Sequence, residues 1–282
     1  MKKRNIMYIA IMIICVIAII VGVYYQVFSK KEKNEITTGE TNSIPNNNTQ
    51  VTSSQELLAE FNSLFGNRLN KQMNRTDDVT RISGLEEQDV IYTVYDIQES
   101  KENQYEIDIK LPVFNVAGDV AAKFNENTQE IFVNKANNIL SGTDKYTIYN
   151  VEYVAYINDN ILSLVIKSTL KEGNSAQRII VQTYNYNMET DEEVSLNDVL
   201  KIYGISATSV NEKIEIQVRE ASKESETISS ATGQIVYKRD LNSAMYITDN
   251  VNNFFIGKDG QIYIIYAYGN TNLTSETDII KI

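Results

Sequence analysis

The sequence predicts an α+β fold, in which an antiparallel sheet packs with helices behind an N-terminal transmembrane helix. Three consecutive strand patterns separated by short turns form a meander over residues 147–186, and residues 253–268 have the pattern of a later hairpin. Consecutive strands joined by short turns pair antiparallel. Helical periodicity at residues 119–140 and 209–226 interrupts the strands without a regular alternation. Such a mixture of strands and helices is typical of the α+β class.

An apolar segment near the N-terminus predicts the membrane span. Residues 6–23 form an unbroken apolar run of 18 residues directly behind Lys2, Lys3 and Arg4. At about 1.5 Å per residue, such a helix nearly crosses a hydrocarbon core of ~30 Å. Basic residues stay on the cytoplasmic side, and the aromatic residues that follow the run suit the membrane interface. We therefore expect a single-pass helix over residues 6–25 in the cell membrane, with the C-terminal domain extracellular.

A cleaved secretory signal is the alternative interpretation of this segment. Val27, Phe28 and Ser29 offer a cleavage triplet, so the chain would be secreted after cleavage near Ser29. The run is longer than the ~7–15 apolar residues of most signal peptides, which favours an uncleaved signal-anchor. The single cysteine, Cys15, lies inside the run. No intramolecular disulfide can form, and the exported portion must be stabilised by a hydrophobic core.

Composition divides the chain into four parts. The cytoplasmic stub and the anchor precede an Asn-, Thr- and Ser-rich stretch, which has too few large apolar residues to build a core and is expected to be a flexible tether. An amphipathic helix over residues 56–73 follows, with Ser54 as its candidate cap, and then a polar loop. The four parts are residues 1–28, 29–55, 56–86 and the extracytoplasmic domain 87–282, which could divide into 87–142 and 143–282.

The first half of the extracytoplasmic domain begins with two strands. Residues 90–97 and 105–114 are rich in β-branched and aromatic side chains. Pro112 lacks an N–H and should lie at a strand end or a sheet edge. The period then changes to that of a helix over residues 119–140, and Gly142 marks its end.

The second half contains the meander, two helices and the hairpin. Ser195 is expected to cap a short helix that ends at Leu200, and a longer helix follows. Lys258, Asp259 and Gly260 form the hairpin turn rather than a phosphate loop, because no helical pattern follows them. The expected strands are residues 147–157, 161–170, 178–186, 253–256, 261–268 and 278–282.

The charge of the portion outside the membrane limits its partners. Three of the 26 Lys and Arg residues precede the span, which leaves 23 against 37 Asp and Glu, a net charge of −14. Nucleic acid is excluded as a partner by this balance. A cationic envelope protein or peptide would be attracted to the domain by it.

Most familiar catalytic chemistry is excluded by composition. The chain has no histidine, which removes Ser-His-Asp and Cys-His catalysis and His-ligated zinc, and Cys15 lies in the membrane span. Carboxylate chemistry remains, but neighbouring acidic residues in turns do not set two carboxylates ~5–9.5 Å apart across a cleft. We therefore predict no catalytic, cofactor-binding or metal-binding residue. The acidic clusters considered were Glu86-Glu87-Asp89, Asp191-Glu192-Glu193 and Asp77-Asp78.

Four segments carry a resemblance to a known family. They are YEIDIKLPVF (105–114), NILSLVIKSTL (160–170), TYNYNMETDEEVSLNDVL (183–200) and NFFIGKDGQIYIIYAYG (253–269). In order and pattern they resemble the extracytoplasmic domain of the anti-sigma-V factor. The same domains of unknown function accompany the catalytic domain of some peptidoglycan deacetylases. The resemblance implies an envelope-facing binding or sensing domain without a catalytic domain.

The chain departs from that family at two places. Members that bind lysozyme have a Gly- and His-containing loop where this chain has residues 171–175, KEGNS, without histidine. About five residues before the span are also too few for a sigma-binding segment. The resemblance therefore implies the fold and the location, but not control of a sigma factor.

These observations predict a membrane-anchored, non-catalytic binding or sensing protein of the bacterial cell envelope. Heavy use of Asn, Ile and Lys is consistent with a Gram-positive source. By resemblance, the ligand would be a muralytic enzyme, a cell-wall fragment or another envelope protein. The alternative is a carboxylate-based cell-wall hydrolase or modifying enzyme, which a deep cleft with two opposed carboxylates would favour.

The predicted topology is directly testable. Protease added to intact protoplasts should remove the C-terminal domain, because Lys2, Lys3 and Arg4 hold the N-terminus inside. Immunoblotting of the protoplasts measures the result. A domain that stays protected until the cells are lysed would reverse the predicted orientation.

Overall fold

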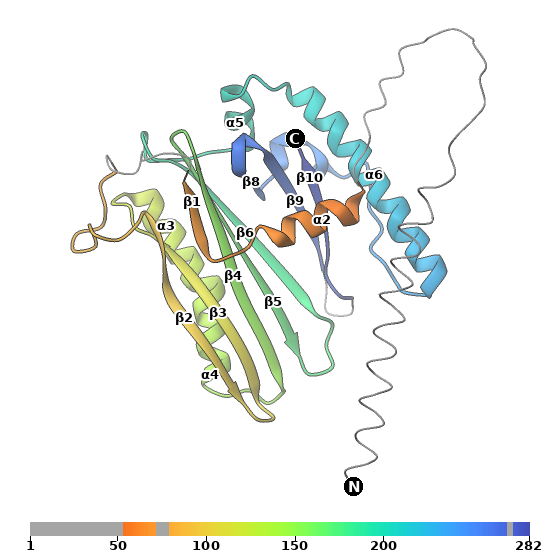
Figure 1. Cartoon of the computed structure of the whole chain (residues 1–282). Coiled ribbons are helices and arrows are strands. Elements are labelled where there is room, and N and C mark those ends of the chain that lie inside the picture. Colours follow the sequence, from red (N-terminus) through yellow and green to blue (C-terminus); the bar gives the residue numbers. More distant parts are fainter. Residues whose placement is uncertain (1–52, 72–78, 270–272) are drawn as a thin grey trace, which may run out of the picture. The chain divides into compact units, whose positions relative to one another are not determined.

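The computed structural model describes residues 53–71, 79–269 and 273–282, which belong to one compact unit (Figure 1). The predicted span over residues 6–25 and nearly all of the predicted tether lie outside these residues. None of the described helices combines the length and the apolar character needed to cross a bilayer. The described domain has the predicted mixed α+β character, with sheets that are mainly antiparallel.

Seven strands of the described chain form the larger sheet, and its centre is the predicted meander. β4, β5 and β6 pair antiparallel along their lengths. One edge of β4 is shared: β3 runs parallel to its first half, and β1 runs parallel to its second half. The order is β2 (Ile91–Lys101), β3 (Tyr105–Phe114), β4 (Thr147–Asn158), β5 (Ile161–Glu172), β6 (Arg178–Asn187) and β7 (Glu192–Glu193), with β1 (Arg68–Lys71) beside β4.

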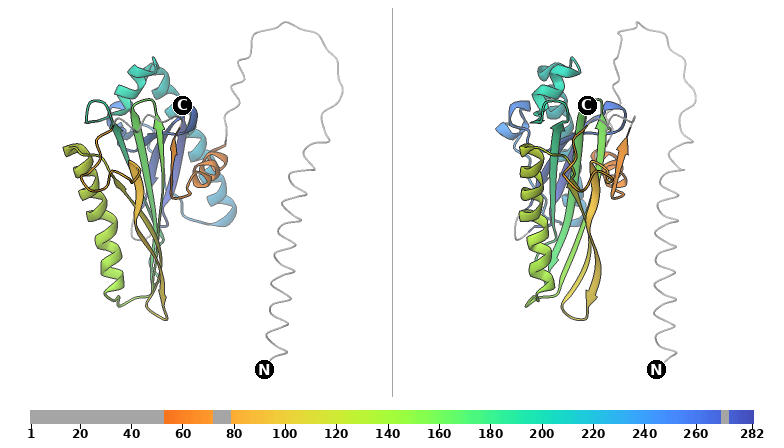
Figure 2. Two further views of the ribbon diagram at one scale, coloured as in Figure 1. Left: turned by 60° about the vertical axis from the view of Figure 1, so that its left-hand side comes forward. Right: turned by 90° about the vertical axis from the view of Figure 1, so that its left-hand side faces the viewer.

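A helical crossover joins the parallel strands β3 and β4, as such strands require. It runs through α3 (Asp119–Thr128), a π-helical turn (Gln129–Val133) and α4 (Asn134–Leu140), which confirms the helix predicted over residues 119–140. Gly142 follows with a φ of 116°, a conformation that favours glycine. The crossover lies on one face of the larger sheet (Figure 2). Phe132 and Ile139 of the crossover belong to the buried core on that face.

The smaller sheet and the remaining helices pack on the opposite face. β8 (Phe254–Ile256) and β9 (Ile262–Tyr268) form the predicted hairpin, and β10 (Glu276–Lys281) pairs antiparallel with β9. Phe255, Tyr263 and Ile265 face the larger sheet, whereas alternate residues of the same strands face α5 (Leu196–Ile202) and α6 (Ala207–Thr232). The result is four layers, in the order α3–α4, larger sheet, smaller sheet, α5–α6.

Pro112 lies inside β3 near its end, opposite Thr93 of β2 and beyond the last residue that β3 pairs with β4. Its other side is therefore a sheet edge, where the missing N–H leaves no ladder bond unmade. The predicted placement at an edge is confirmed.

The helix predicted over residues 56–73 is shorter in the structure. The N-cap of α2 (Ser54–Ser63) is Ser53 rather than the predicted Ser54, and the side chains of Ser53 and Glu56 form a reciprocal capping box. The chain then turns through Asn67, with a φ of 51°, and pairs as β1 with β4. Asn67 N–H donates to Tyr153 O at 2.9 Å, and Tyr153 N–H donates to Asn67 Oδ1 at 3.0 Å. Leu69, beyond the turn, is also apolar because it packs against the core of the larger sheet. The helical pattern in the sequence therefore extended past the point where the helix ends.

The outer edge of β8 is hydrogen-bonded by side chains of the larger sheet rather than by another strand. Phe254 N–H donates to Thr183 Oγ1 at 3.2 Å, and Phe254 O accepts from Asn185 Nδ2 at 2.8 Å. Because these groups point away from β9, they would otherwise be unpaired in the interior. We call the four buried side chains that bind this edge the polar row: Asn158, Ser163, Thr183 and Asn185.

The other two members of the polar row complete the edge. Ile256 N–H donates to Ser163 Oγ at 3.1 Å, and Asn158 Nδ2 donates to the carbonyls of Ile256 and Gly257 at 3.1 and 2.9 Å. Ser163 Oγ also donates to Asn185 Oδ1 at 2.6 Å. The two sheets are thus joined by directional bonds as well as by apolar contact.

Asn185→Leu should destabilise the domain by about 1–3 kcal/mol, because it leaves the buried Phe254 carbonyl without a donor. Asn150→Leu is the matched control, since Asn150 is exposed on β4. Denaturant unfolding of the full chain in detergent, followed by near-ultraviolet circular dichroism of the tyrosines, measures the difference. Equal stability of the two variants would show that the polar row contributes little.

Candidate functional site

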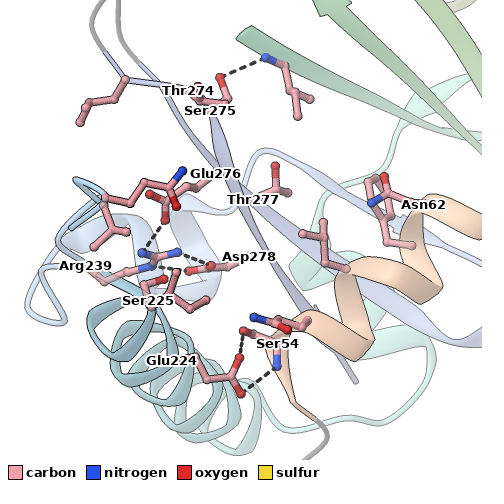
Figure 3. A pocket seen from close by; sticks show the side chains of 18 of the residues that line it. Ser54, Asn62, Glu224, Ser225, Arg239, Thr274, Ser275, Glu276, Thr277 and Asp278 are labelled. Atoms are coloured by element: carbon pink, nitrogen blue, oxygen red, sulfur yellow. Dashed lines mark hydrogen bonds and ion pairs between the residues drawn. The ribbon is translucent and has the colours of Figure 1, made fainter. Parts of the chain in front are cut away.

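The described domain contains a cavity of about 580 Å³ between α2, the C-terminal half of α6 and the start of β10 (Figure 3). This volume is in the range of small-molecule and peptide sites. Its apolar walls include Leu58 and Phe61 from α2 and Ile228 from α6, while Thr277 comes from β10. The residues 234–236, which follow α6, line its mouth.

A buried ion pair network holds the stretch after α6 against β10. Arg239 donates from Nη2 to Asp278 Oδ1 at 2.8 Å and from Nε to Asp278 Oδ2 at 3.1 Å. Its Nη1 lies 2.8 Å from Glu276 Oε2 and also donates to the carbonyl of Tyr237 at 2.8 Å. The Arg239 side chain is only 3% exposed. Bidentate pairing of this kind fixes geometry as well as charge.

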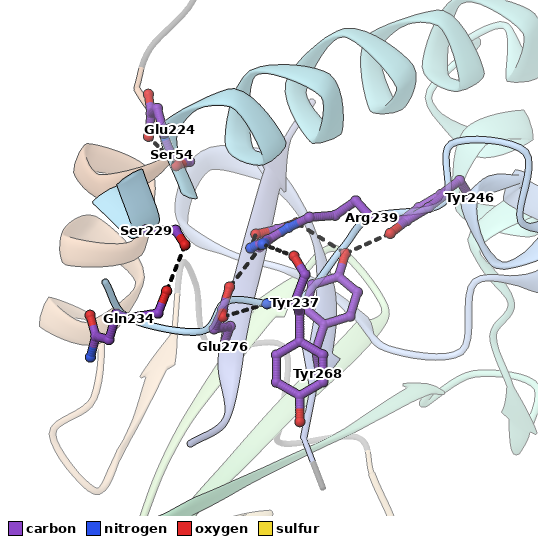
Figure 4. Close-up of polar contacts among 10 residues, drawn as sticks. Ser54, Glu224, Ser229, Gln234, Tyr237, Arg239, Tyr246, Tyr268 and Glu276 are labelled. Carbon is purple, nitrogen blue, oxygen red and sulfur yellow. Dashed lines mark hydrogen bonds and ion pairs between the residues drawn. The ribbon is translucent and has the colours of Figure 1, made fainter. Parts of the chain in front are cut away.

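Two opposing effects act on the pKa of Arg239. Burial by itself would lower the pKa of Arg239, but the hydrogen bond and charge of Asp278, together with those of Glu276, outweigh it and raise this pKa. The guanidinium therefore stays charged. Tyr268 adds a further donor, because its hydroxyl lies 3.0 Å from Asp278 Oδ2 and 2.8 Å from the hydroxyl of Tyr246 (Figure 4). Burial and the charge of Asp278 raise the pKa of Tyr268.

The other charged side chains of the cavity wall are also paired. Glu224 accepts hydrogen bonds from the N–H and the hydroxyl of Ser54 at the start of α2, where the helix dipole favours an anion. Lys167 lies 2.8 Å from Glu152 and donates to Asn62 Oδ1 at 2.9 Å. Each charged residue that the structure places in this wall thus has a partner within the chain.

The acidic clusters singled out from the sequence do not line this cavity. Glu86 accepts the N–H of Gly84 at 2.9 Å in the loop before β2, and backbone hydrogen bonds from Gly84 and from its own N–H lower its pKa. Asp191 accepts the hydroxyl of Tyr186 at 3.0 Å in the turn before β7. Glu86 and Asp191 thus stabilise local turns, while Glu192 and Glu193 form β7. Asp77 and Asp78 lie outside the described residues, and no group of three acidic or sulfur ligands suited to a metal occurs in the described part.

The acidic residues that do line the cavity were not found from the sequence. Asp278 stands next to Ile279 and Ile280 in a predicted strand, and a charge in an apolar strand was the one available signal. Arg239 lies in a stretch without periodicity, 39 residues from its partner. Nothing local marks that pairing.

No protein-family model matches the sequence, and no curated protein matches it. Among solved structures, a DUF3298 family protein from Pseudomonas aeruginosa PAO1 is similar at a TM-score of 0.40 and 10% identity, over 64% of this chain and 84% of that chain. A DUF3298 family member from Bacteroides fragilis NCTC 9343 is similar at a TM-score of 0.34 and 13% identity, over 63% of this chain and 80% of that chain. Similarity at this level assigns neither family nor activity, so the resemblance to the anti-sigma-V ectodomain stays a prediction.

Arg239→Met should destabilise the domain by about 3–5 kcal/mol, because it leaves the buried Asp278 without a counter-charge. Arg219→Met is the control: Arg219 pairs with Glu215 on the exposed face of α6, and such pairs contribute about 0–1 kcal/mol. Adding Asp278→Asn to Arg239→Met should recover part of the loss. A double variant no more stable than Arg239→Met would contradict the role assigned to the buried charge pair.

Proposed function

We propose that this chain is a membrane-anchored, outward-facing protein of the bacterial envelope whose α+β domain binds a ligand in the cavity between α2, α6 and β10, without catalysing a reaction. The observation that carries this proposal is the cavity itself, about 580 Å³ in volume, with its charged wall residues already paired within the chain.

The engagement of the wall carboxylates favours binding over carboxylate-based hydrolysis. A hydrolase of that kind needs one carboxyl that gives up a proton and a second that attacks or activates water. Here Glu276 and Asp278 are held by Arg239, and Glu224 is held by the N-terminus of α2. Carboxylates fixed in this way maintain the shape of a site, which is what recognition requires.

The charge of the chain supports a cationic partner. With a net charge of −14 beyond the predicted span, the exported portion attracts basic proteins over several ångströms before contact. Long-range attraction raises the association rate, while the cavity, whose charged wall residues are paired within the chain, selects what is finally bound. A basic envelope protein, or a wall fragment attached to one, fits both features.

Filling the cavity should abolish binding. Ser225→Trp places a large ring in the wall of the cavity, whereas Ser230→Trp places the same ring on an exposed position of the same helix. The full chain in detergent is tested for binding to cell-wall sacculi and, separately, to lysozyme as a cationic probe. We expect at least one of the two to bind, with binding lost in Ser225→Trp and kept in Ser230→Trp. Release of sugar or peptide fragments from sacculi, abolished by replacing one carboxylate, would instead establish the hydrolase.

Association with the cationic probe should also depend on salt. Screening shortens the reach of the charges from about 10 Å at 0.1 M salt to ~3 Å at 1 M. The association rate measured by surface plasmon resonance should fall over this range, while the dissociation rate changes little. An association rate that does not change with salt concentration would rule out electrostatic attraction.

A further inference from the structure

The first part of the β10 edge that faces away from β9 lies in the cavity. Ile282 N–H donates to Ile262 O at 2.9 Å. The backbone N–H and C=O groups of the even-numbered residues of β10 therefore point toward β9. Lys281 N–H points away from β9 and donates to Gln217 Oε1 at 3.4 Å. By the same alternation, the backbone N–H and C=O of Thr277 face outward, and Thr277 lines the cavity. Among the described residues these two groups have no hydrogen-bond partner.

The two edges of the smaller sheet are treated differently. The outer groups of β8 are all hydrogen-bonded by the polar row. The stretch after α6 runs beside β10 but reaches it through side chains: Tyr237 N–H donates to Glu276 Oε1 at 2.9 Å, and Arg239 binds Asp278. One edge is closed and the other keeps an open position. Proteins normally protect such edges, because an unpaired edge binds another strand.

The surroundings of Thr277 suit a single extended chain. Ile279, the next residue whose backbone faces outward, is 1% exposed, so the open edge is short and lies between walls. A folded second copy could not bring a flat sheet edge into this recess. Ile235 at the cavity mouth is 74% exposed and offers an apolar contact for a side chain of the ligand. The charged wall residues are already paired, which suits the uncharged groups of a main chain.

Resting on the proposed function, we propose that the ligand of this cavity is an extended polypeptide segment that lies beside β10 and exchanges main-chain hydrogen bonds with Thr277. Strand addition of this kind takes its affinity from backbone groups and its specificity from alternate side chains. The segment would belong to an envelope protein and would carry an apolar residue for Ile235. Basic residues outside the paired stretch would be attracted by the acidic surface.

The first test uses short random peptides displayed on phage and selected on the full chain in detergent. The tightest peptide is then synthesised with each backbone nitrogen methylated in turn. Pairing with Thr277 alone predicts that methylation of one peptide nitrogen, the one that donates to Thr277 O, weakens binding about tenfold or more, while methylation at the other positions has a much smaller effect. Equal loss at all positions, or no loss, would overturn the proposal.

The second test changes the protein. Thr277→Pro removes the outward N–H, and an edge strand tolerates proline at such a position. Thr277→Val is the matched control, because it keeps the N–H and removes only the hydroxyl. The proline variant should bind the selected peptide at least tenfold more weakly than the valine variant does. Near-ultraviolet circular dichroism checks the fold, and if Thr277→Pro fails to fold, the methylation pattern on the unaltered protein decides.

Further outcomes separate this inference from the proposed function. If sacculi or lysozyme bind and Ser225→Trp abolishes that binding, but no peptide is selected, the cavity binds another class of ligand and only the peptide inference fails. If a selected peptide still binds Ser225→Trp, it lies elsewhere and the inference fails. Dimerisation of the free chain that Thr277→Pro abolishes would make a second copy the occupant, which also overturns it.

Discussion

The hydrogen bonds between the polar row and the backbone of β8 determine where the smaller sheet lies. Apolar contact alone would let two sheets slide or rotate, because it has no direction. Here four backbone groups of Phe254 and Ile256 each have a side-chain partner on the larger sheet, and all are removed from water. Such a network is costly if one member is missing, so it favours a single arrangement. The position of β8 sets that of β9, and β9 in turn places β10 and the cavity beside it.

A second constraint acts at β10, the opposite edge of the smaller sheet. Arg239 attaches the stretch after α6 to β10 through two carboxylates, with bonds at 2.8 and 3.1 Å to Asp278. α2 is held nearby by the hydrogen bonds between Ser54 and Glu224 of α6. The walls of the cavity therefore come from three segments that are held by polar contacts. Those contacts also determine which apolar side chains line the cavity.

Local patterns predicted the elements well and their partners less well. The meander, the hairpin and the crossover helix follow from periods that a few neighbouring residues reveal. The polar row could not be predicted, because Thr183 and Asn185 alternate with tyrosines just as solvent-facing residues do, and Ser163 is a single small residue within an apolar run. The turn at Asn67 was missed since the apolar positions suit a helix and a strand alike. Pairing of Arg239 with Asp278 depends on the tertiary fold, and no sequence window contains it.

The packing of α2 has a consequence for the order of folding. Leu57 and Phe61 are buried beside Ile279 of β10, and Glu60 binds Lys281, 221 residues further along the chain. A ribosome or an export channel delivers the chain from its N-terminal side, so α2 emerges long before the strand that covers it. Contacts of such separation form late and slow the search for the native state. Until β10 is available, the apolar face of α2 remains exposed to other proteins, and a chaperone has time to bind it.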